Sequence, residues 1–240
     1  MPDKRNHRGP HPDDQKLFSS SQLESLSTAV SDYSLLLTKG YADVSSLKLV
    51  CDHFSLTQRQ RLAVMRSACS DSQLKLRKKS QIGIADIAGQ SIAIDGYNVL
   101  ITIEAAKSGA FLFRGRDGCL RDLASIHGTY RKVQETIPAI ELIGEFLKEY
   151  QVSSAVWFLD KPVSNSGRLK KILEEIAEQN SWSWQVKLSQ SPDAELKKCD
   201  CPIASSDSAI LDNCNCWFNL AAEIIEKRLL SGKTLNLYAN

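Results

Sequence analysis

The stretch that decides the fold is Ser91-Ile92-Ala93-Ile94-Asp95-Gly96-Tyr97-Asn98, a short apolar run that ends in an aspartate. An apolar run bounded by turn-forming residues is typical of a strand that is buried on both faces of a sheet. Asp95 would then lie at the carboxyl end of that strand, which is where open parallel sheets bind their ligands. We therefore expect a functional site around Asp95 and Asn98.

Downstream of this strand, apolar runs alternate with amphipathic segments. The runs are predicted as strands at 91–94, 155–159, 184–188, 202–204 and 217–218, and the amphipathic segments as helices at 137–150, 167–179, 206–212 and 220–230. This alternation favours a parallel sheet with helices on both of its faces. The sequence therefore predicts an α/β domain over residues 81–240.

The first 80 residues have a different character. Residues 1–14 are rich in Pro, Gly and charge and are predicted as an extended arm. Helical periodicity recurs over 15–37, 44–54 and 57–69. We therefore predict a small all-α domain over 15–80, in which the basic run 71–81 is a linker to the α/β domain.

The composition fits an ordinary globular protein, with 42% hydrophobic residues and a net charge of +2. No run resembles a membrane span of about 20 apolar residues, so we expect a cytoplasmic protein with no membrane association. Residues 1–80 carry 13 Lys and Arg against 8 Asp and Glu, whereas residues 81–240 carry 17 against 20. A basic front half suits binding to a polyanion, although imbalances of this size are also common.

Three later aspartates stand in the same position relative to a strand as Asp95. They are Asp160 after the run 155–159, Asp193 after 184–188 and Asp207 after 202–204. Four carboxylates at one edge of a sheet repel one another unless a cation holds them or some stay protonated. Mg²⁺ or Mn²⁺ is the cation that oxygen ligands of this kind favour. The alternative is that each aspartate only caps a helix or a turn.

These residues resemble a known superfamily. Asp95-Gly96-Tyr97-Asn98 after an apolar strand is similar to the opening motif of the PIN-like ribonucleases, especially of their NYN branch. Asp160, Asp193 in SPDAEL (191–196) and Asp207 in SSDS (205–208) resemble that branch's later acidic positions. The resemblance covers about residues 90–230 and implies a PIN-like Rossmannoid parallel sheet. It also implies a metal-dependent endoribonuclease that hydrolyses RNA.

The resemblance also assigns roles to the acidic residues. Asp95, Asp160 and Asp207 would hold one or two metal ions, with Asp193 as a further ligand or a neighbour of the ligands. The metal would lower the pKa of a bound water and orient the resulting hydroxide. Asn98 would donate its amide to a carboxylate or phosphate oxygen, or else serve as a turn residue.

A second resemblance involves the N-terminal part. The segments RGPHP (8–12), LLLTKGY (35–41) and LTQRQR (56–61) resemble a family of unknown function, DUF434, in which a helical domain precedes a PIN-like one. This resemblance spans the whole chain and implies no activity.

The chain departs from the simpler PIN-like proteins in a long stretch between the first strand and the helix 137–150. We interpret this stretch as an exposed hairpin, with Asp117 and Asp122 as further candidates for the acidic site. Glu141 corresponds to an acid often found on the first long helix of the family. Glutamates recur every four residues from Glu141, however, which is also typical of a solvated helix face.

Several hydroxyls and cations are candidates for binding phosphate, because hydroxyls, helix N-termini and cations favour it. Their alternative roles are helix capping and solvated surface charge. They are Ser164, Ser166 and Arg168 in the loop after the second strand, Ser206 beside the last of the four aspartates, and Arg59 and Arg61, with Arg66, on the helix 57–69.

Four of the seven cysteines form two Cys-x-Cys pairs, Cys199/Cys201 and Cys214/Cys216. Each pair precedes a predicted strand, where residues i and i+2 face the same side, so the four sulfurs could converge on a structural Zn²⁺. Such a site would lie at the opposite end of the strands from the aspartates. Because Cys-x-x-Cys is the more usual zinc spacing, free thiols that only pack are the default and a disulfide is a further alternative.

Two other functions fit the same residues. A degenerate PIN-like domain could bind RNA or a protein without cutting it, and a phosphatase or nucleotidase could use the same acidic strand ends. An aspartyl-phosphate mechanism, however, requires a second aspartate two residues after Asp95, and this position is occupied by Tyr97. A homodimer is compatible with the sequence.

Overall fold

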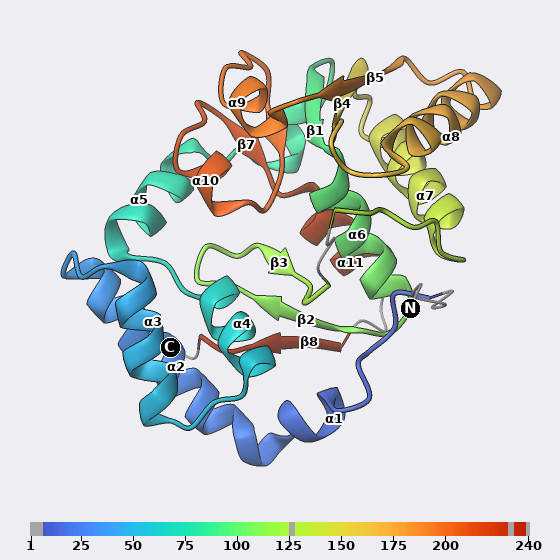
Figure 1. Ribbon diagram of the computed structural model, residues 1–240. Coiled ribbons are helices and arrows are strands. Elements are labelled where there is room, and N and C mark those ends of the chain that lie inside the picture. Colours follow the sequence, from blue (N-terminus) through green and yellow to red (C-terminus); the bar gives the residue numbers. More distant parts are fainter. Residues whose placement is uncertain (1–6, 125–127, 230–232, 239–240) are drawn as a thin grey trace.

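The computed structural model describes residues 7–124, 128–229 and 233–238. Its centre is a parallel sheet built from β1 (Ser91–Asp95), β4 (Ser154–Asp160), β5 (Trp184–Ser189), β6 (Ile203–Ala204) and β7 (Trp217–Phe218). The strand order is β5-β4-β1-β6-β7 (Figure 1). The chain moves outward from β1 to β5 and then returns to the other side of β1. The strand order therefore reverses between β1 and β6, where α/β sheets bind ligands.

Helices cover both faces of this sheet. One face is covered by α6 (Gly96–Lys107), α7 (Thr136–Glu149), α8 (Ser166–Gln179) and α11 (Leu220–Arg228). The short helices α9 (Pro192–Leu196) and α10 (Ser208–Leu211) cover the other face. Successive strand residues point to opposite sides, so Ile94 and Trp157 join the first core whereas Ala93 and Phe158 join the second. The predicted parallel α/β architecture is confirmed.

Helix α6 was not predicted, because its sequence lacks an amphipathic period. Its residues 96–106 are buried except for Asn98, and they include the run Val99-Leu100-Ile101-Thr102-Ile103. A helix that is surrounded by core on all sides shows no polar face, and β-branched residues disfavour helix in isolation. Tertiary packing therefore determines this element.

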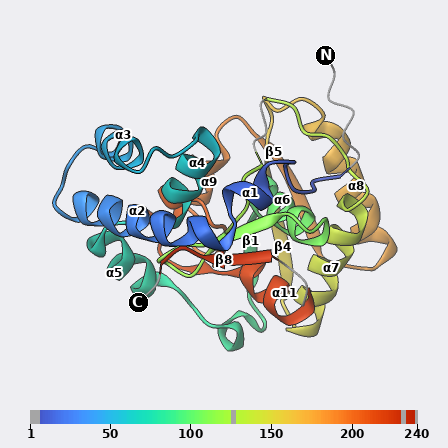
Figure 2. The ribbon, with the colours of Figure 1, turned by 90° about the horizontal axis from the view of Figure 1, so that it is seen from below.

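The N-terminal region is helical, as predicted. It contains α1 (Asp14–Leu17), α2 (Ser20–Thr38), α3 (Asp43–His53) and α4 (Gln58–Ser67), seen from below in Figure 2. The expected helix 15–37 is interrupted at Phe18, which is buried. Helix α4 begins with a capping box, in which the Thr57 side chain and the Gln60 side chain each bond the other's backbone N–H.

The prediction of a basic linker at 71–80 is wrong, because this segment is helix α5 (Asp71–Ser80). A second capping box, between Ser70 and Gln73, starts the helix. Arg77 is buried and binds Asp117 at 2.6 Å and Asp212 at 2.7 Å. The charge that suggested a solvated linker is therefore partly engaged in the interior. A 3-10 turn, η1 (Ile84–Ile87), leads on to β1.

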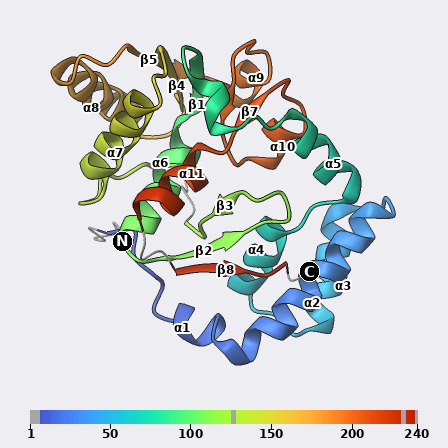
Figure 3. The same cartoon turned by 180° about the vertical axis from the view of Figure 1, so that it is seen from behind.

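The prediction of an exposed hairpin is also wrong. The strands β2 (Phe111–Arg114) and β3 (Leu120–Arg121) do form a hairpin, but Phe113 and Leu120 are completely buried. Strand β8 (Lys233–Asn236) pairs with β2 to give a second sheet of order β3-β2-β8, which Figure 3 shows from behind. Phe113 shares a core with Leu26 of α2 and Val64 of α4. The helical region therefore packs directly on segments of the α/β half.

Residues 7–11 of the predicted arm form neither helix nor strand, residues 12–13 form a turn that leads into α1, and residues 1–6 lie outside the described part of the chain. The arm is held by Arg8, whose Nε donates to the Glu104 carboxylate at 2.7 Å and whose guanidinium lies 5.2 Å from the Tyr130 ring centroid. Among the described residues, no helix has the length and apolar character needed to span a membrane.

Candidate active site at the acidic edge of the sheet

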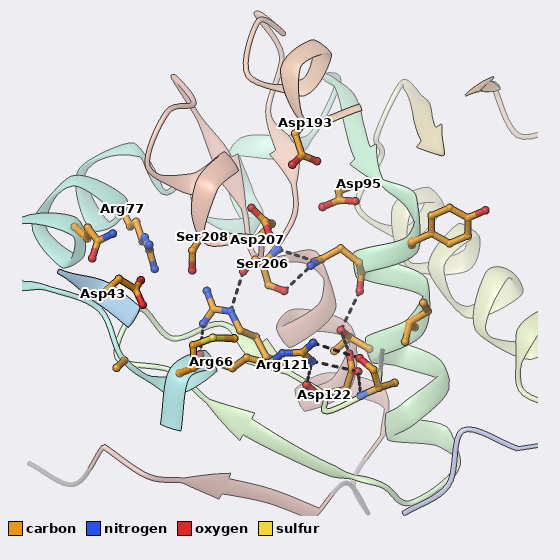
Figure 4. Close-up of a pocket in the computed structure, with 18 of the residues that line it drawn as sticks. Asp43, Arg66, Arg77, Asp95, Arg121, Asp122, Asp193, Ser206, Asp207 and Ser208 are labelled. Atoms are coloured by element: carbon orange, nitrogen blue, oxygen red, sulfur yellow. Dashed lines mark hydrogen bonds and ion pairs between the residues drawn. The ribbon is translucent and has the colours of Figure 1, made fainter. Parts of the chain in front are cut away.

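The four predicted aspartates lie at the carboxyl edge of the parallel sheet, and we call them the acidic edge. Asp95 ends β1, Asp160 ends β4, Asp193 lies in the first turn of α9, and Asp207 is the N-cap of α10. The carboxylates of Asp95, Asp193 and Asp207 point toward a common space (Figure 4). The structure thus brings Asp95, Asp193 and Asp207 to one space, and places Asp160 at the end of the neighbouring strand β4.

The position of Asp95 depends on the glycine that follows it. A Cβ at Gly96 would lie 2.6 Å from Leu159 Cδ2 and 2.9 Å from the backbone oxygen of Phe158, far inside ordinary contact distance. Glycine therefore lets the start of α6 pass close to β4. This close approach places Asp95 and Asn98 at the crevice beside β6.

A hydrogen-bond network between β1 and the β6 loop fixes the geometry. The Ser205 hydroxyl donates to Asp95 Oδ2 at 2.7 Å and accepts from the Asp207 backbone N–H at 2.9 Å. Asn98 Oδ1 accepts from the backbone N–H and the hydroxyl of Ser206, at 2.8 and 2.9 Å. With its oxygen engaged, Asn98 keeps its amide N–H₂ for another partner, consistent with the predicted donor role.

Asp207 also serves as a helix cap. Its Oδ1 accepts from the backbone N–H groups of Ala209 and Ile210, at 2.8 and 3.1 Å. The capping alternative considered for this residue is therefore observed. It does not exclude a ligand role, because a carboxylate has two oxygens and about four lone-pair sites.

The acidic edge differs from the buried acidic groups of the protein in its lack of ion pairs, although the charge of Lys197 opposes the rise in the pKa of Asp193. Within the described residues, none of its four carboxylates forms an ion pair, whereas every fully buried carboxylate elsewhere has a basic partner. These pairs are Asp14 with Arg59, Glu104 with Arg8, Asp117 with Arg77 and Arg121, Asp122 with Arg66, and Glu135 with His7. Uncompensated carboxylates in partly buried positions destabilise a fold, so their retention suggests an external cation.

The carboxyl groups of Asp95, Asp160 and Asp193 have raised pKa values, as expected for acidic groups that lie close together. Burial raises the pKa of Asp95 to about 7; the Ser205 hydroxyl opposes this shift, and the charges of Asp207, Asp193 and Asp160 add to it. Burial and the Asp193 charge raise the pKa of Asp160, and burial and the Asp207 charge raise that of Asp193. Each of these carboxyls is therefore close enough to another to resist its ionisation.

The donor set fits a hard divalent ion. Mg²⁺ and Mn²⁺ favour oxygen ligands, and Mg²⁺ is commonly bound by one or two carboxylates together with waters and a substrate phosphate. Among the described residues, no three His, Cys, Asp or Glu side chains are arranged to hold a metal ion by themselves. The acidic edge therefore suits an ion that keeps its waters and not one that needs a full cage of protein ligands.

A cavity of about 650 Å³ adjoins the acidic edge. Asp95, Asp193 and Asp207 line it together with Asn98 and Ser206, whereas Asp160 lies outside its lining. The helical region forms the opposite wall. That wall includes Tyr33 and Leu37 of α2, Met65 and Arg66 of α4, and Gln73 and Arg77 of α5.

Several predicted binding residues lie away from this cavity. Arg59 is engaged by the buried Asp14, and Arg61 binds Asp52 at 2.6 Å and the Leu56 carbonyl at 2.9 Å. Ser164 and Arg168 are exposed on the loop after β4, and the Ser166 hydroxyl bonds the Lys161 carbonyl at 3.4 Å. None of these residues lines the cavity, whereas Ser206 does.

The three additional acidic candidates differ in their surroundings. Asp117 is buried between Arg77 and Arg121, which hold its pKa well below the usual range, so it acts as a structural counter-ion. Asp122 lines the cavity and accepts the Thr102 hydroxyl at 2.9 Å. Glu141 is exposed on α7 and does not line the cavity, which supports the interpretation that it belongs to a solvated helix face.

All seven cysteines are free thiols. Cys199, Cys201, Cys214 and Cys216 are half-buried near the amino ends of β6 and β7, opposite the acidic edge, as predicted. Burial raises the pKa of Cys199, Cys214 and Cys216. The described structure holds no disulfide between them, in agreement with the default prediction.

Sequence reasoning missed part of the site. Arg66 was grouped with Arg59 and Arg61 on one helix, but only Arg66 faces the cavity. Arg121 was not considered; its Nε donates to the Ser206 carbonyl at 2.8 Å and thereby supports the loop that carries Asp207. The helical period of α4 does separate Arg66 from its neighbours, but no sequence signal tells which face meets the sheet.

Comparison with known proteins is consistent with the two-part organisation. Residues 84–223 match a family model described as a domain of unknown function (DUF5616), and residues 25–79 match one described as a protein of unknown function (DUF434). Neither model describes a PIN or NYN family. An uncharacterized protein of Methanocaldococcus jannaschii is 35% identical over 204 residues, which cover 84% of this chain and 97% of the relative. No solved structure matches.

The expected DUF434 resemblance is thus confirmed for the N-terminal helices, while the sheet is described by a separate model of its own. The DUF5616 match spans more than half of the chain and contains all four residues of the acidic edge. The chain belongs to the DUF5616 family, with a DUF434 region preceding that domain.

Proposed function

We propose that this protein is a metal-dependent nuclease of PIN-like type that hydrolyses RNA phosphodiester bonds at the acidic edge. The observation that carries the proposal is the set of four carboxylates at one sheet edge, which form no ion pair among the described residues and three of which line a cavity. Their position after β1, β4, β5 and β6, together with the strand order of the sheet, supports the PIN-like assignment.

Bound Mg²⁺ or Mn²⁺ supplies a water of lowered pKa and offsets charge on the phosphate. The residues of the chain hold and orient the reactants. Asp95 is kept in place by the Ser205 hydroxyl, and the Asn98 amide N–H₂ is directed by the bonds that Ser206 makes to its oxygen. Asp193, at the exposed rim, contributes negative charge that favours the cation.

The second candidate is RNA binding without cleavage. It is favoured by one observation, which is that the described residues contain no preformed group of three metal ligands. A protein of this kind would bind RNA in the same cavity but leave the phosphodiester bond intact in every divalent ion.

The experiment is a cleavage assay on a labelled single-stranded RNA with purified protein in Mn²⁺, Mg²⁺ or EDTA. We expect cleavage with either divalent ion, none in EDTA and none by Asp95→Asn, which preserves size and the acceptor for Ser205. Asp200→Asn is the matched control, because Asp200 is exposed between Cys199 and Cys201, away from the acidic edge. Binding without cleavage by the wild type would favour the second candidate, and equal activity of Asp95→Asn would refute the proposed site.

A further inference from the structure

Helix α4 of the DUF434 region faces the acidic edge across the cavity, and nothing in the proposed chemistry yet accounts for it. Met65 and Arg66 are consecutive on this helix and both line the cavity. Met65 is an exposed hydrophobic residue, with 40% of its surface accessible. An exposed apolar side chain beside a cation is a common arrangement for contacts to nucleic acid, where bases stack and phosphates pair.

The three arginines that line the cavity differ in how much charge they can offer to a ligand. The side chains of Arg77 and Arg121 are 1% and 8% exposed, and both bind the Asp117 carboxylate directly. Their charges are therefore neutralised and withdrawn from solvent. They serve to hold the cavity wall together.

Arg66 is in a different position, with 25% of its side chain exposed. Its guanidinium donates hydrogen bonds to the backbone carbonyls of Asp122 and Ala124, which carry no net charge. Its ion pair with Asp122 is long, with 3.6 Å between Arg66 Nη1 and Asp122 Oδ1, against 2.6 to 2.7 Å for the pairs of Arg77 and Arg121 with Asp117. Because a guanidinium has five N–H donors, this one keeps donors for a further anion.

We propose that α4 provides the strand-binding wall of the cavity, with Arg66 binding a phosphate of the RNA and Met65 packing against a base. This inference rests on the proposed function, because the ligand is the RNA strand whose phosphodiester bond lies at the acidic edge. It assigns the DUF434 region a role, which is to complete the substrate site that the sheet begins. A guanidinium suits this role because its planar donors match phosphate oxygens.

The test measures binding of a fluorescein-labelled ten-nucleotide oligouridylate by anisotropy, with Asp95→Asn as the background in which cleavage is not expected. Arg66→Met should weaken binding about ten-fold, as loss of a charge-assisted hydrogen bond does. It should also reduce the slope of log K against log salt concentration by about 0.7, the share of one phosphate contact on a single strand. A purely structural role for Arg66 would not change that slope.

The matched control is Arg61→Met, which removes the same charge from the same helix at a residue that pairs with Asp52 and does not line the cavity. We expect its affinity and salt slope to stay at the background values. Because Arg66→Met also removes bonds to the 122–124 loop, Met65→Glu is a second variant. Met65 is exposed, so this change should weaken binding by like-charge repulsion while the thermal midpoint stays unchanged.

The outcomes separate this inference from the proposed function. If wild-type protein cleaves RNA but Arg66→Met and Met65→Glu bind and cut normally, the role of α4 is refuted and the nuclease stands. If RNA is bound without cleavage and both variants weaken binding, α4 is the binding wall of a non-catalytic protein. If the two variants lose no more affinity than Arg61→Met, or if no oligouridylate binds at all, the inference is wrong.

Discussion

Replacing the half-buried Asp95 with asparagine should make the metal-free protein more stable at alkaline pH, contrary to the usual effect of a point mutation. The folded-state pKa of Asp95 is about 7, whereas the ordinary value is 3.8. The folded protein therefore binds the proton more tightly than the unfolded chain does. Ionisation of Asp95 therefore leaves the free energy of unfolding of the wild type unaffected below the pKa of the unfolded chain. It lowers this free energy as the pH rises from about 4 to 7, and the free energy remains reduced above that range.

The magnitude follows from this shift of about three pKa units, at about 1.4 kcal/mol for each unit. The upper bound is thus about 4 kcal/mol. Because Asp95 is only partly buried and solvent screens its neighbours, we expect about 2 kcal/mol at pH 8. Asparagine carries no charge and still accepts from Ser205, so the variant should escape this penalty without losing the bond.

The assay is urea denaturation in EDTA at pH 4.5, 6 and 8, followed by tryptophan fluorescence. The free energies of unfolding of the two proteins should be similar at pH 4.5 and should diverge in favour of Asp95→Asn as the pH rises. At pH 8, Mn²⁺ should restore the wild type and leave the variant unchanged. Parallel pH profiles for the two proteins would refute the claim that the carboxylates at the acidic edge are uncompensated.

Two further predictions concern the scaffold. Arg8→Met should lower the free energy of unfolding by about 3 kcal/mol, measured by thermal or urea unfolding, because it leaves the buried Glu104 without its cation. The double variant Arg8→Met with Glu104→Gln should recover most of this loss. A loss that persists in the double variant would count against the ion pair. Gly144→Ala would place a Cβ about 2.0 Å from the Trp182 ring. We therefore expect the free energy of unfolding to fall by about 1–3 kcal/mol and the tryptophan fluorescence to change. An unchanged free energy of unfolding would show that the ring moves freely.

The acidic edge was predictable because its signal is local in sequence. Asp95 and Asp160 directly follow a buried apolar run and Asp207 follows one after two serines, and the geometry of a parallel sheet then brings their side chains to one edge. No knowledge of long-range packing was required beyond the expectation of a parallel sheet. The same reasoning identified Ser206 and Asn98, which bond one another across the crevice.

The remaining features depend on contacts between distant segments. Phe113 and Leu237 are far apart in sequence but share one core with the N-terminal helices. The charge of Arg77 suggested a solvated linker, and only the positions of Asp117 and Asp212 explain its burial. The orientation of α4, which turns Arg66 toward the cavity and Arg61 away from it, follows from this packing and not from the period of the helix itself.

Manganese binding tests the central claim most directly, because it requires neither the correct RNA nor turnover. Free Mn²⁺ can be measured by electron paramagnetic resonance during titration of the wild type, Asp95→Asn and the control Asp200→Asn at pH 8. We predict that the wild type and Asp200→Asn take up Mn²⁺ with the same affinity and that Asp95→Asn binds it at least ten-fold more weakly, as expected for loss of a ligand carboxylate. Equal Mn²⁺ binding by all three proteins, or binding by none, would contradict the account of the acidic edge as a metal site.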